Sequence, residues 1–250
     1  MAGGLERFRA LNFEAFRQLA LDDALSDHER IGFPDSYRAG FDQAIVGDIF
    51  GKLPVLLESG KIVFDIGPGC SEVPKSIMAE CARRGNELVL IDSAEMLGRL
   101  PSHDSIRKVS GRFPDCMSEL VSYRGRVDAV ICYSVLHYAL VDVAFFRFVD
   151  SMFALLAPGG SCLIGDIPNL SMRKRFFSSE TGIAFHKRFM QTQDAPLVST
   201  YEIADDLIDD AVVLSVMMRA RAAGFHAYVL PQPATLPMAN RREDLLITRP

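Results

Sequence analysis

The sequence lacks the marks of a secreted, membrane-spanning or metal-binding protein. Its five cysteines are scattered, with no C-x-x-C pair and no spacing typical of metal ligands, so we expect reduced thiols in the cytoplasm and no metal site. The N-terminus carries charges throughout and has no unbroken apolar stretch of the signal-peptide kind. No apolar run approaches the roughly 18 residues that a bilayer-spanning helix needs, so no membrane partner is expected.

Basic residues are also fewer than acidic residues. Lysine and arginine number 27 against 32 aspartates and glutamates, and the formal net charge of −5 gives no general attraction to nucleic acid or anionic lipid. There is no internal repeat and no low-complexity segment. With 250 residues, 49% of them hydrophobic, we expect one large domain with added segments and no second full core. The oligomeric state stays open, a homodimer included.

Helical spacing dominates the first part of the chain. Apolar residues recur near helical intervals from Leu5 and Phe8 up to about residue 57, with a loop or turn around Pro34. We therefore predict a helical N-terminal cap over residues 1–57.

From residue 61, short β-rich apolar runs alternate with helix-like segments. The segments 72–84 and 142–157 predict helices, and we expect the sequence APGG at 157–160 to end the second of them. Strands that alternate with helices are typical of a parallel sheet with right-handed crossovers. The five predicted strands cover residues 61–66, 87–92, 105–109, 127–133 and 161–167.

The C-terminal part has a different order of elements. A helix is predicted over about 203–223, and two strands follow at 225–230 and 243–248 with no helix between them. We expect these strands to pair antiparallel as a hairpin. The prediction is an α/β fold with a seven-stranded, mostly parallel sheet over residues 58–250, which is not the strand plan of a dinucleotide dehydrogenase.

The segment VFDIGPGCSE carries the strongest motif of the chain. A predicted strand delivers Asp65, and Gly67, Pro68 and Gly69 follow before Ser71, a candidate helix N-cap. Glycines let the backbone turn tightly and let a ligand approach the main chain, and ligands bind at the carboxyl ends of parallel strands. A plain turn between a strand and a helix would use the same residues, so the motif alone leaves both interpretations open.

A carboxylate ends the second predicted strand. In LVLIDSAEML, Asp92 follows the glycines by roughly 25 residues, a separation at which an acid binds both ribose hydroxyls in many adenine-nucleoside sites. An aspartate at this position can instead cap the following helix.

In combination, four segments resemble the class I S-adenosylmethionine-dependent methyltransferases, which have a Rossmann-like fold. The segments are DIGPG, IDSAEM, DAVICYSVLHY and LLAPGGSCLIGD, in that order. The resemblance covers about residues 60–170, and the predicted C-terminal hairpin agrees with it. It implies S-adenosylmethionine as the cofactor and methyl transfer as the reaction. One departure is Ser71, at a position where many members have a third glycine.

The resemblance also implies a role for each matching residue. The methionine end of the cofactor would be lined by Asp65, Gly67, Pro68 and Gly69. The ribose would be held by Asp92. The adenine would be flanked by Ser93, Met96, Arg112 and Phe113. The sulfonium would lie next to Tyr133 and Ser134.

NAD is the nearest rival ligand. A dinucleotide fingerprint that starts at Gly67 requires a glycine at position 72, where the chain has Glu72. A carboxylate in the first turn of the helix would repel a pyrophosphate, whereas the cationic methyl donor tolerates acidic neighbours.

Two residues are candidates for removing a proton from an acceptor hydroxyl. His137 lies just past the fourth predicted strand and Asp166 at the end of the fifth, so both would face the cofactor cleft in the resembled fold. The alternatives are a histidine that packs on the sheet and an aspartate that caps a turn. Tyr138 could orient an acceptor or simply form a pocket wall.

The connection over residues 167–202 is long, and we predict that it forms a lid that selects the acceptor. Between residues 170 and 190 it carries five basic residues against one acid. Such a run is either a solvated face or a clamp for an acidic or phosphorylated acceptor, such as a nucleotide-linked sugar. The candidate acceptor-binding residues are Tyr138, Arg173, Arg175 and His186, together with Tyr37 in the cap. Arg38 and Phe41 are expected to roof the same cleft, or to pack in the core.

Together these patterns predict methyl transfer to a small molecule, with a hydroxyl as the expected acceptor. An RNA methyltransferase is disfavoured by the net charge, although the basic segment keeps it open. A non-catalytic protein that binds the cofactor is a third alternative, because the fold alone does not establish activity.

Overall fold

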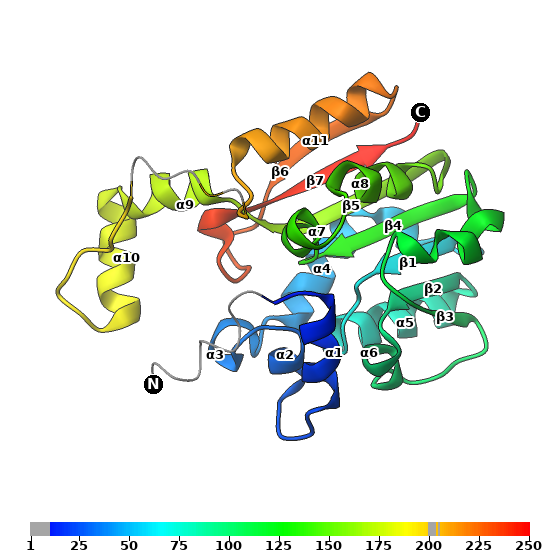
Figure 1. Ribbon diagram of the computed structural model, residues 1–250, viewed down its shortest axis with the longest axis horizontal. Coiled ribbons are helices and arrows are strands. Elements are labelled where there is room, and N and C mark those ends of the chain that lie inside the picture. The colour runs from blue at the N-terminus through cyan, green and yellow to red at the C-terminus, as the bar shows by residue number, and fades with distance from the viewer. Residues whose placement is uncertain (1–10, 200–203, 205) are drawn as a thin grey trace.

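The computed structural model describes residues 11–199, 204 and 206–250, and these contain a single seven-stranded sheet (Figure 1). The strand order is β3-β2-β1-β4-β5-β7-β6. Strands β1 to β5 pair parallel with one another, and β7 pairs antiparallel with both β5 and β6. The strands are β1 (Ile62–Ile66), β2 (Glu87–Asp92), β3 (Ile106–Ser110), β4 (Val127–Tyr133), β5 (Leu156–Pro168), β6 (His226–Pro231) and β7 (Arg242–Thr248). The predicted sheet and its antiparallel C-terminal hairpin are confirmed.

The start of β5 differs from the prediction. The helix before it, α8 (Phe145–Phe153), ends earlier than expected, so the APGG segment forms the first part of β5. Gly160 makes this possible, because a Cβ there would lie 2.6 Å from the carbonyl oxygen of Val127 on the neighbouring strand β4. Here the glycine permits two strands to approach closely and does not end a helix.

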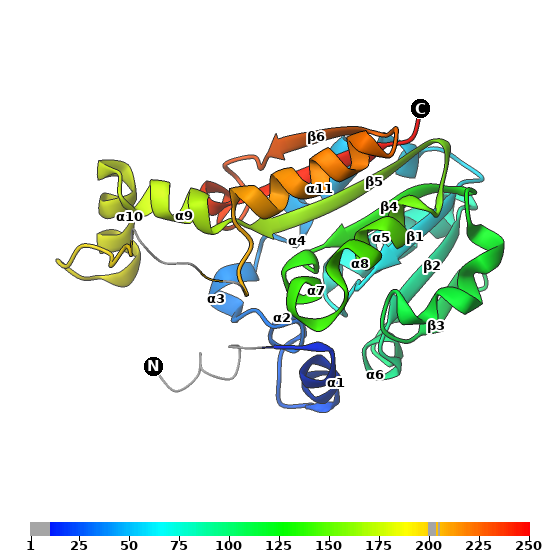
Figure 2. The same cartoon turned by 45° about the horizontal axis from the view of Figure 1, so that its top comes forward.

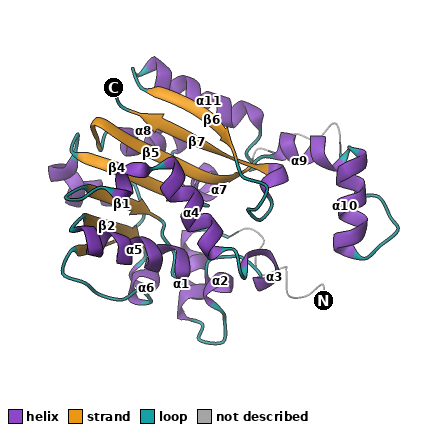
Figure 3. Cartoon of the chain, turned by 180° about the vertical axis from the view of Figure 1, so that it is seen from behind, coloured by secondary structure: helices purple, strands orange, loops and turns teal. Residues whose placement is uncertain are grey.

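Helices cover both faces of the sheet, since each central strand places apolar side chains alternately on the two faces. Phe64 and Ile66 contribute to the core beneath α8 and α11 (Asp210–Ala222), whereas Val63 belongs to the core beneath α4 (Asp42–Lys52) and α5 (Glu72–Arg84). Figures 1 and 3 show these two sides of the sheet.

Four further helices follow β2, β4 and β5 along the chain. They are α6 (Ala94–Gly98), α7 (Leu136–Asp142), α9 (Leu170–Phe177) and α10 (Glu180–Met190), with 3-10 turns at Pro54–Leu57, Asp115–Tyr123 and Ala239–Arg241. Among the described residues, no helix is both long enough and apolar enough to cross a membrane.

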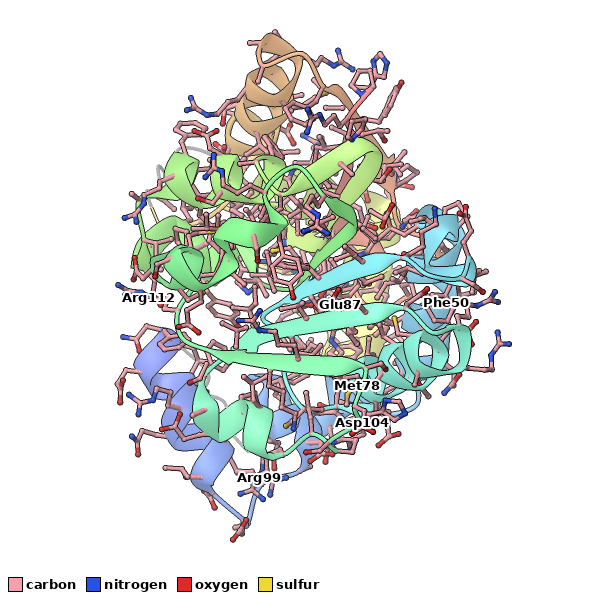
Figure 4. The ribbon with its side chains drawn as sticks, turned by 90° about the vertical axis from the view of Figure 1, so that its right-hand side faces the viewer. Phe50, Met78, Glu87, Arg99, Asp104 and Arg112 are labelled. Carbon is pink, nitrogen blue, oxygen red and sulfur yellow. The ribbon has the colours of Figure 1, made fainter. Side chains whose placement is uncertain are left out.

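The N-terminal cap consists of α1 (Phe13–Leu21), α2 (Asp27–Arg30), α3 (Asp35–Arg38) and α4. The predicted loop around Pro34 leads directly into the single turn of α3, and Leu5 and Phe8 lie outside the described residues. Charged side chains attach α1 to α6. Arg17 pairs with Glu95 at 2.6 Å, and Arg99, which is labelled in Figure 4, donates to the carbonyl oxygen of Ala20 at 2.8 Å.

In the described part of the connection predicted over residues 167–202, α9 and α10 form a helical arm. The two helices project away from the sheet (Figure 2). Their corner is tight, because a Cβ at Gly182 would overlap the carbonyl oxygen of Phe176. The predicted connection therefore has regular structure of its own. The start of the helix predicted over 203–223 lies partly outside the described residues, and α11 begins at Asp210.

The cap contacts the loop of Gly67, Pro68 and Gly69 that follows β1, which we call the glycine loop. Gly69 has a φ of +70°, and a Cβ there would lie 2.6 Å from Cγ2 of Ile31 in the cap. Gly85, at the end of α5, has a similar φ of +67° but no atom within 4 Å of the same position. Backbone conformation restricts both positions to glycine, whereas contact with the cap restricts Gly69 alone.

These two glycines give a matched test of the cap contact. Gly85→Ala is expected to lower the free energy of unfolding by about 1–2 kcal/mol through left-handed strain. Gly69→Ala should lower the free energy of unfolding by about 1–3 kcal/mol more because of overpacking against Ile31. The double variant Gly69→Ala with Ile31→Ala should recover part of that additional loss. Urea denaturation of the three variants measures the difference. Equal losses for the two alanine variants would show that Ile31 does not constrain the loop.

Candidate functional site

A cavity lies at the carboxyl ends of β1, β2 and β4, beneath the cap. Its empty volume is about 1200 Å³ with the open mouth included. The sheet contributes the loops after these strands, α7 contributes Tyr138, and the cap contributes Phe13, Phe16 and Ile31. Segments far apart in sequence therefore meet at the edge of the sheet where parallel α/β folds bind ligands.

The glycine loop forms one wall of this cavity, and Gly67, Pro68 and Gly69 all line it. Gly67 has a φ of +71°, and a Cβ there would lie 2.6 Å from the side chain of Val135. The side chains of Val135 and Ile31 thus occupy the places where side chains at Gly67 and Gly69 would lie, so the loop contributes only its backbone to this part of the wall. The hydroxyl of Ser71 caps α5 by accepting a hydrogen bond from Val73 at 3.4 Å, so the departure at this position has a structural role.

Asp65 ends β1 with a buried carboxyl group that lines the cavity. Within the described part of the chain, no hydrogen bond reaches this group. Burial, and secondarily the nearby charge of Asp92, raise the pKa of Asp65 to about 8. A cationic ligand group beside it would favour the ionised form.

Asp92 also faces the cavity, at the end of β2. Its carboxylate accepts hydrogen bonds from the N–H of Ser93 at 2.7 Å and from that of Gly69 at 3.2 Å. Burial raises the pKa of Asp92 to about 6, with the two backbone donors acting in the opposite direction. The donors fix the carboxylate in place next to the glycine loop, in a position to accept further hydrogen bonds from ligand hydroxyls.

The residues predicted beside an adenine have different surroundings. Met96 and Phe113 are buried and line the cavity, and the Phe113 ring packs edge-on against Phe148 at a centroid distance of 5.3 Å. Arg112 lies at the mouth next to α1 (Figure 4), where it pairs with Asp115 at 2.7 Å. Ser93 is turned towards α6, and its hydroxyl accepts the N–H of Met96 at 3.1 Å.

The end of β4 presents Tyr133 and Ser134 to the cavity. Ser134 has a φ of +62°, which is uncommon for a residue other than glycine. Its hydroxyl contacts Asp166 and accepts a hydrogen bond from Arg38 at 2.8 Å. The Tyr133 ring lies so close to Gly165 that a Cβ there would overlap it, so the glycine sets where this aromatic ring lies.

Asp166 is the centre of a buried ion-pair network and does not line the cavity. Its carboxylate contacts Arg38 of the cap and accepts a hydrogen bond from Arg242 of β7 at 2.7 Å. Burial alone would raise the pKa of Asp166, but the two arginines and the Ser134 hydroxyl outweigh it, so the pKa lies below its ordinary value. A carboxylate held in this way is a poor proton acceptor, so the geometry does not support the prediction that Asp166 acts as a general base.

His137 is not among the residues that line the cavity either. Its Nδ1 is inaccessible and has no hydrogen-bond partner among the described residues. Burial lowers the pKa of His137 to about 3, with nearby Arg242 acting in the same direction. The imidazole is therefore neutral and only weakly basic, so this geometry favours the alternative of a histidine packed on the sheet.

The predicted acceptor residues separate into two groups. Tyr138 lines the cavity, and its ring packs against Phe16 at a centroid distance of 4.7 Å. The others lie outside the cavity. Arg175 pairs with Asp210 at 2.5 Å and Arg173 lies over the Phe177 ring. His186 packs against Phe177, and Tyr37 contacts Phe189 of the arm.

Sequence reasoning did not identify Arg242, which completes the network around Asp166. It follows Arg241 in the link to the last strand, with no motif around it. Only the antiparallel insertion of β7 beside β5 brings it to Asp166, so no local signal could have indicated its position. His28, which lines the cavity and contacts Asp42 at 3.0 Å, was missed for the same reason.

No protein-family model matches the sequence, and no curated protein matches it. Solved structures resemble the fold. The plantazolicin methyltransferase BpumL, in complex with a triazolic desmethylPZN analogue and S-adenosylhomocysteine, has a TM-score of 0.58 and 10% identity, with 100% of this chain and 99% of that chain covered.

Two further structures give the same result. The N-methyltransferase NodS from Bradyrhizobium japonicum, in complex with S-adenosylhomocysteine, has a TM-score of 0.53 and 13% identity, covering 95% of this chain and 98% of that chain. A SAM-dependent methyltransferase from Archaeoglobus fulgidus has a TM-score of 0.51 and 13% identity, covering 86% and 97%. This chain therefore has the fold of the class I S-adenosylmethionine-dependent methyltransferases.

Proposed function

We propose that this protein transfers a methyl group from S-adenosylmethionine to a small-molecule acceptor. One observation carries the proposal: the glycine loop, the carboxyl group of Asp65 and the oriented carboxylate of Asp92 line a single cavity. These are the groups that a methionine moiety and a ribose require, and they lie on neighbouring strands at the correct edge of the sheet.

The charge of the cavity fits this cofactor. Four aspartates line it, namely Asp42, Asp65, Asp92 and Asp142, against two arginines. An acidic cavity disfavours a pyrophosphate and stabilises a ligand that carries ammonium and sulfonium groups. Glu72, in the first turn of α5, adds to this preference.

When bound, the cofactor would supply a methyl carbon already activated for displacement. The residues of this chain would then mainly bind and align: Asp92 the ribose hydroxyls, Met96 and Phe113 the base, and Tyr133 the acceptor side. Alignment of this kind accounts for much of the acceleration in displacement reactions. We assign no proton transfer to Asp166 or His137, because the first is ion-paired and the second is only weakly basic.

The acceptor would be small, and a hydroxyl is the proposed nucleophile. The cap covers the cavity with Phe13, Phe16 and Phe33. These rings line a space that is suited to a small metabolite. The basic residues of the arm lie outside this cavity, and Arg175 is already paired with Asp210. An acceptor clamp on the arm and an RNA substrate therefore receive no support from the geometry.

Asp92→Ala tests the cofactor site directly. Loss of charge-assisted hydrogen bonds to the ribose should weaken binding of S-adenosylhomocysteine by about 1–3 kcal/mol, measured by isothermal titration calorimetry. Asp104→Ala, at an exposed position between α6 and β3, is the matched control and should bind as the wild type does. Wild-type protein that binds no S-adenosylhomocysteine would refute the proposed function, and unchanged affinity in Asp92→Ala would remove this residue from the site.

Asp65 makes cofactor affinity depend on pH. Its pKa of about 8 in the free protein means that a ligand requiring the carboxylate must displace a proton below that pH. Affinity for S-adenosylmethionine should therefore rise between pH 6 and pH 8, by up to about tenfold per pH unit. Asp65→Asn should bind more weakly at pH 8 and lose this dependence. A flat profile for the wild type would show that ionised Asp65 does not take part in binding.

A further inference from the structure

The arm ends in a turn that presents basic and apolar side chains together. The last turn of α10 consists of Lys187, Arg188, Phe189 and Met190. Phe189 is 49% exposed and Met190 is 57% exposed, and Leu197 in the segment that follows is 97% exposed. Large apolar side chains beside charged ones on an exposed element mark a surface that another molecule covers.

The two helices of the arm give this turn a packed support. The Phe185 ring stacks on that of Phe189 at a centroid distance of 5.7 Å and packs edge-on against Phe176 of α9 at 5.6 Å. A Cβ at Gly182 would overlap the carbonyl oxygen of Phe176, so the helices are in close contact. The exposed side chains therefore lie on a folded element that projects from the sheet (Figures 1 and 2).

The arm is basic, although the protein as a whole is acidic. Residues 170–190 carry five basic side chains and the single acid Glu180, whereas the net charge of the whole chain is −5. Among the described residues, only Arg175 of these five forms an ion pair with an acid of the body, Asp210. No acidic side chain in the described part of the chain pairs with Lys187 or Arg188. The last turn of α10 therefore keeps its positive charge.

A bilayer with anionic headgroups matches both features of the turn. Basic side chains attract the headgroups, and apolar side chains enter the boundary between headgroups and acyl chains. RNA would use the charges and leave Met190 and Leu197 in water. A second copy of this chain matches less well, because its exposed acids Asp23, Asp115 and Asp150 already pair with arginines.

We propose that the last turn of α10 binds the surface of an anionic lipid bilayer. Met190 and Leu197 enter the interface. Lys187 and Arg188 contact the headgroups. A helix that lies on a bilayer needs neither a spanning length nor a positive net charge over the whole chain, so the features that argue against a membrane-spanning protein do not apply to it. The inference is independent of the methyl transfer proposed for the cavity.

Sedimentation of the full chain with lipid vesicles tests the role of charge. Phosphatidylcholine vesicles with about 30% phosphatidylglycerol should bind the protein at least about tenfold more tightly than pure phosphatidylcholine vesicles. Sodium chloride at about 0.5 M should remove most of this difference, because it screens exposed charges. Lys187→Glu with Arg188→Glu should lower the affinity for the anionic vesicles at least about tenfold.

Arg83→Glu with Arg147→Glu is the matched control. It reverses two exposed charges of the body, in α5 and α8, and changes the net charge by the same amount. This variant should bind the anionic vesicles as the wild type does. If it weakens binding as much as Lys187→Glu with Arg188→Glu, the charge of the arm has no special role and the proposal is wrong.

Met190→Trp tests whether the apolar side chains enter the bilayer. The chain contains no tryptophan, so this variant has a single indole. Its emission should shift to shorter wavelength on addition of anionic vesicles, and brominated acyl chains should quench it, because an indole is favoured at the membrane interface. Arg147→Trp should show neither change. Met190→Ser with Leu197→Ser should weaken vesicle binding about tenfold or more through loss of apolar burial.

Three results would overturn the proposal. The first is equal binding to the two kinds of vesicle, or binding to neither. The second is a dimer, detected by light scattering, that Met190→Ser with Leu197→Ser dissociates while no vesicles are bound. The third is RNA binding in a filter assay without vesicle binding. The last two would show that a different molecule covers this turn.

Discussion

The contact of Asp166 with Arg38 and Arg242 joins three parts of the chain that are remote in sequence. Arg38 comes from the cap, Asp166 from the end of β5 and Arg242 from the start of β7. A buried carboxylate is costly unless cations and donors surround it, so the sheet and the cap must be in register for any of the three to be satisfied. The position of the cap, and with it the enclosure of the cavity, depends on this network.

Enclosure in turn explains the chemistry of the cavity. Beneath the cap, Asp65 and Asp92 lie in a low-dielectric space, and burial raises both pKa values. The same burial strengthens any interaction with a cationic ligand. Ile31 of the cap approaches the glycine loop, so the segment that lines the cavity is also the segment that contacts the cap.

Much of the fold could be predicted from the sequence, because buried parallel strands are short, apolar and separated by helices. Strands β1, β2 and β4 begin and end within a residue of the predicted positions. The start of β5 could not be predicted, since Gly160 reads as a helix stop in sequence and functions as a close contact with Val127 only in the sheet. The arm was predicted as a lid from the length of the connection, and its two helices were not predicted; few of their side chains are buried.

The residues of the candidate site also differ in how far the sequence could predict their positions. Residues carried by a local motif, such as Gly67 and Asp92, line the cavity. Asp166 and His137, whose surroundings depend on residues remote in sequence, do not line it. Asp166 lies at the expected strand end, but the arginines that determine its charge come from the cap and from β7, and no sequence spacing encodes that meeting.

The most direct measurement of the central claim is a crystal structure with S-adenosylhomocysteine bound. We expect the ribose hydroxyls on Asp92, the base between Met96 and Phe113, and the amino acid moiety along Gly67 to Gly69. A cavity that stays empty at saturating ligand, or a ligand bound away from these residues, would contradict it.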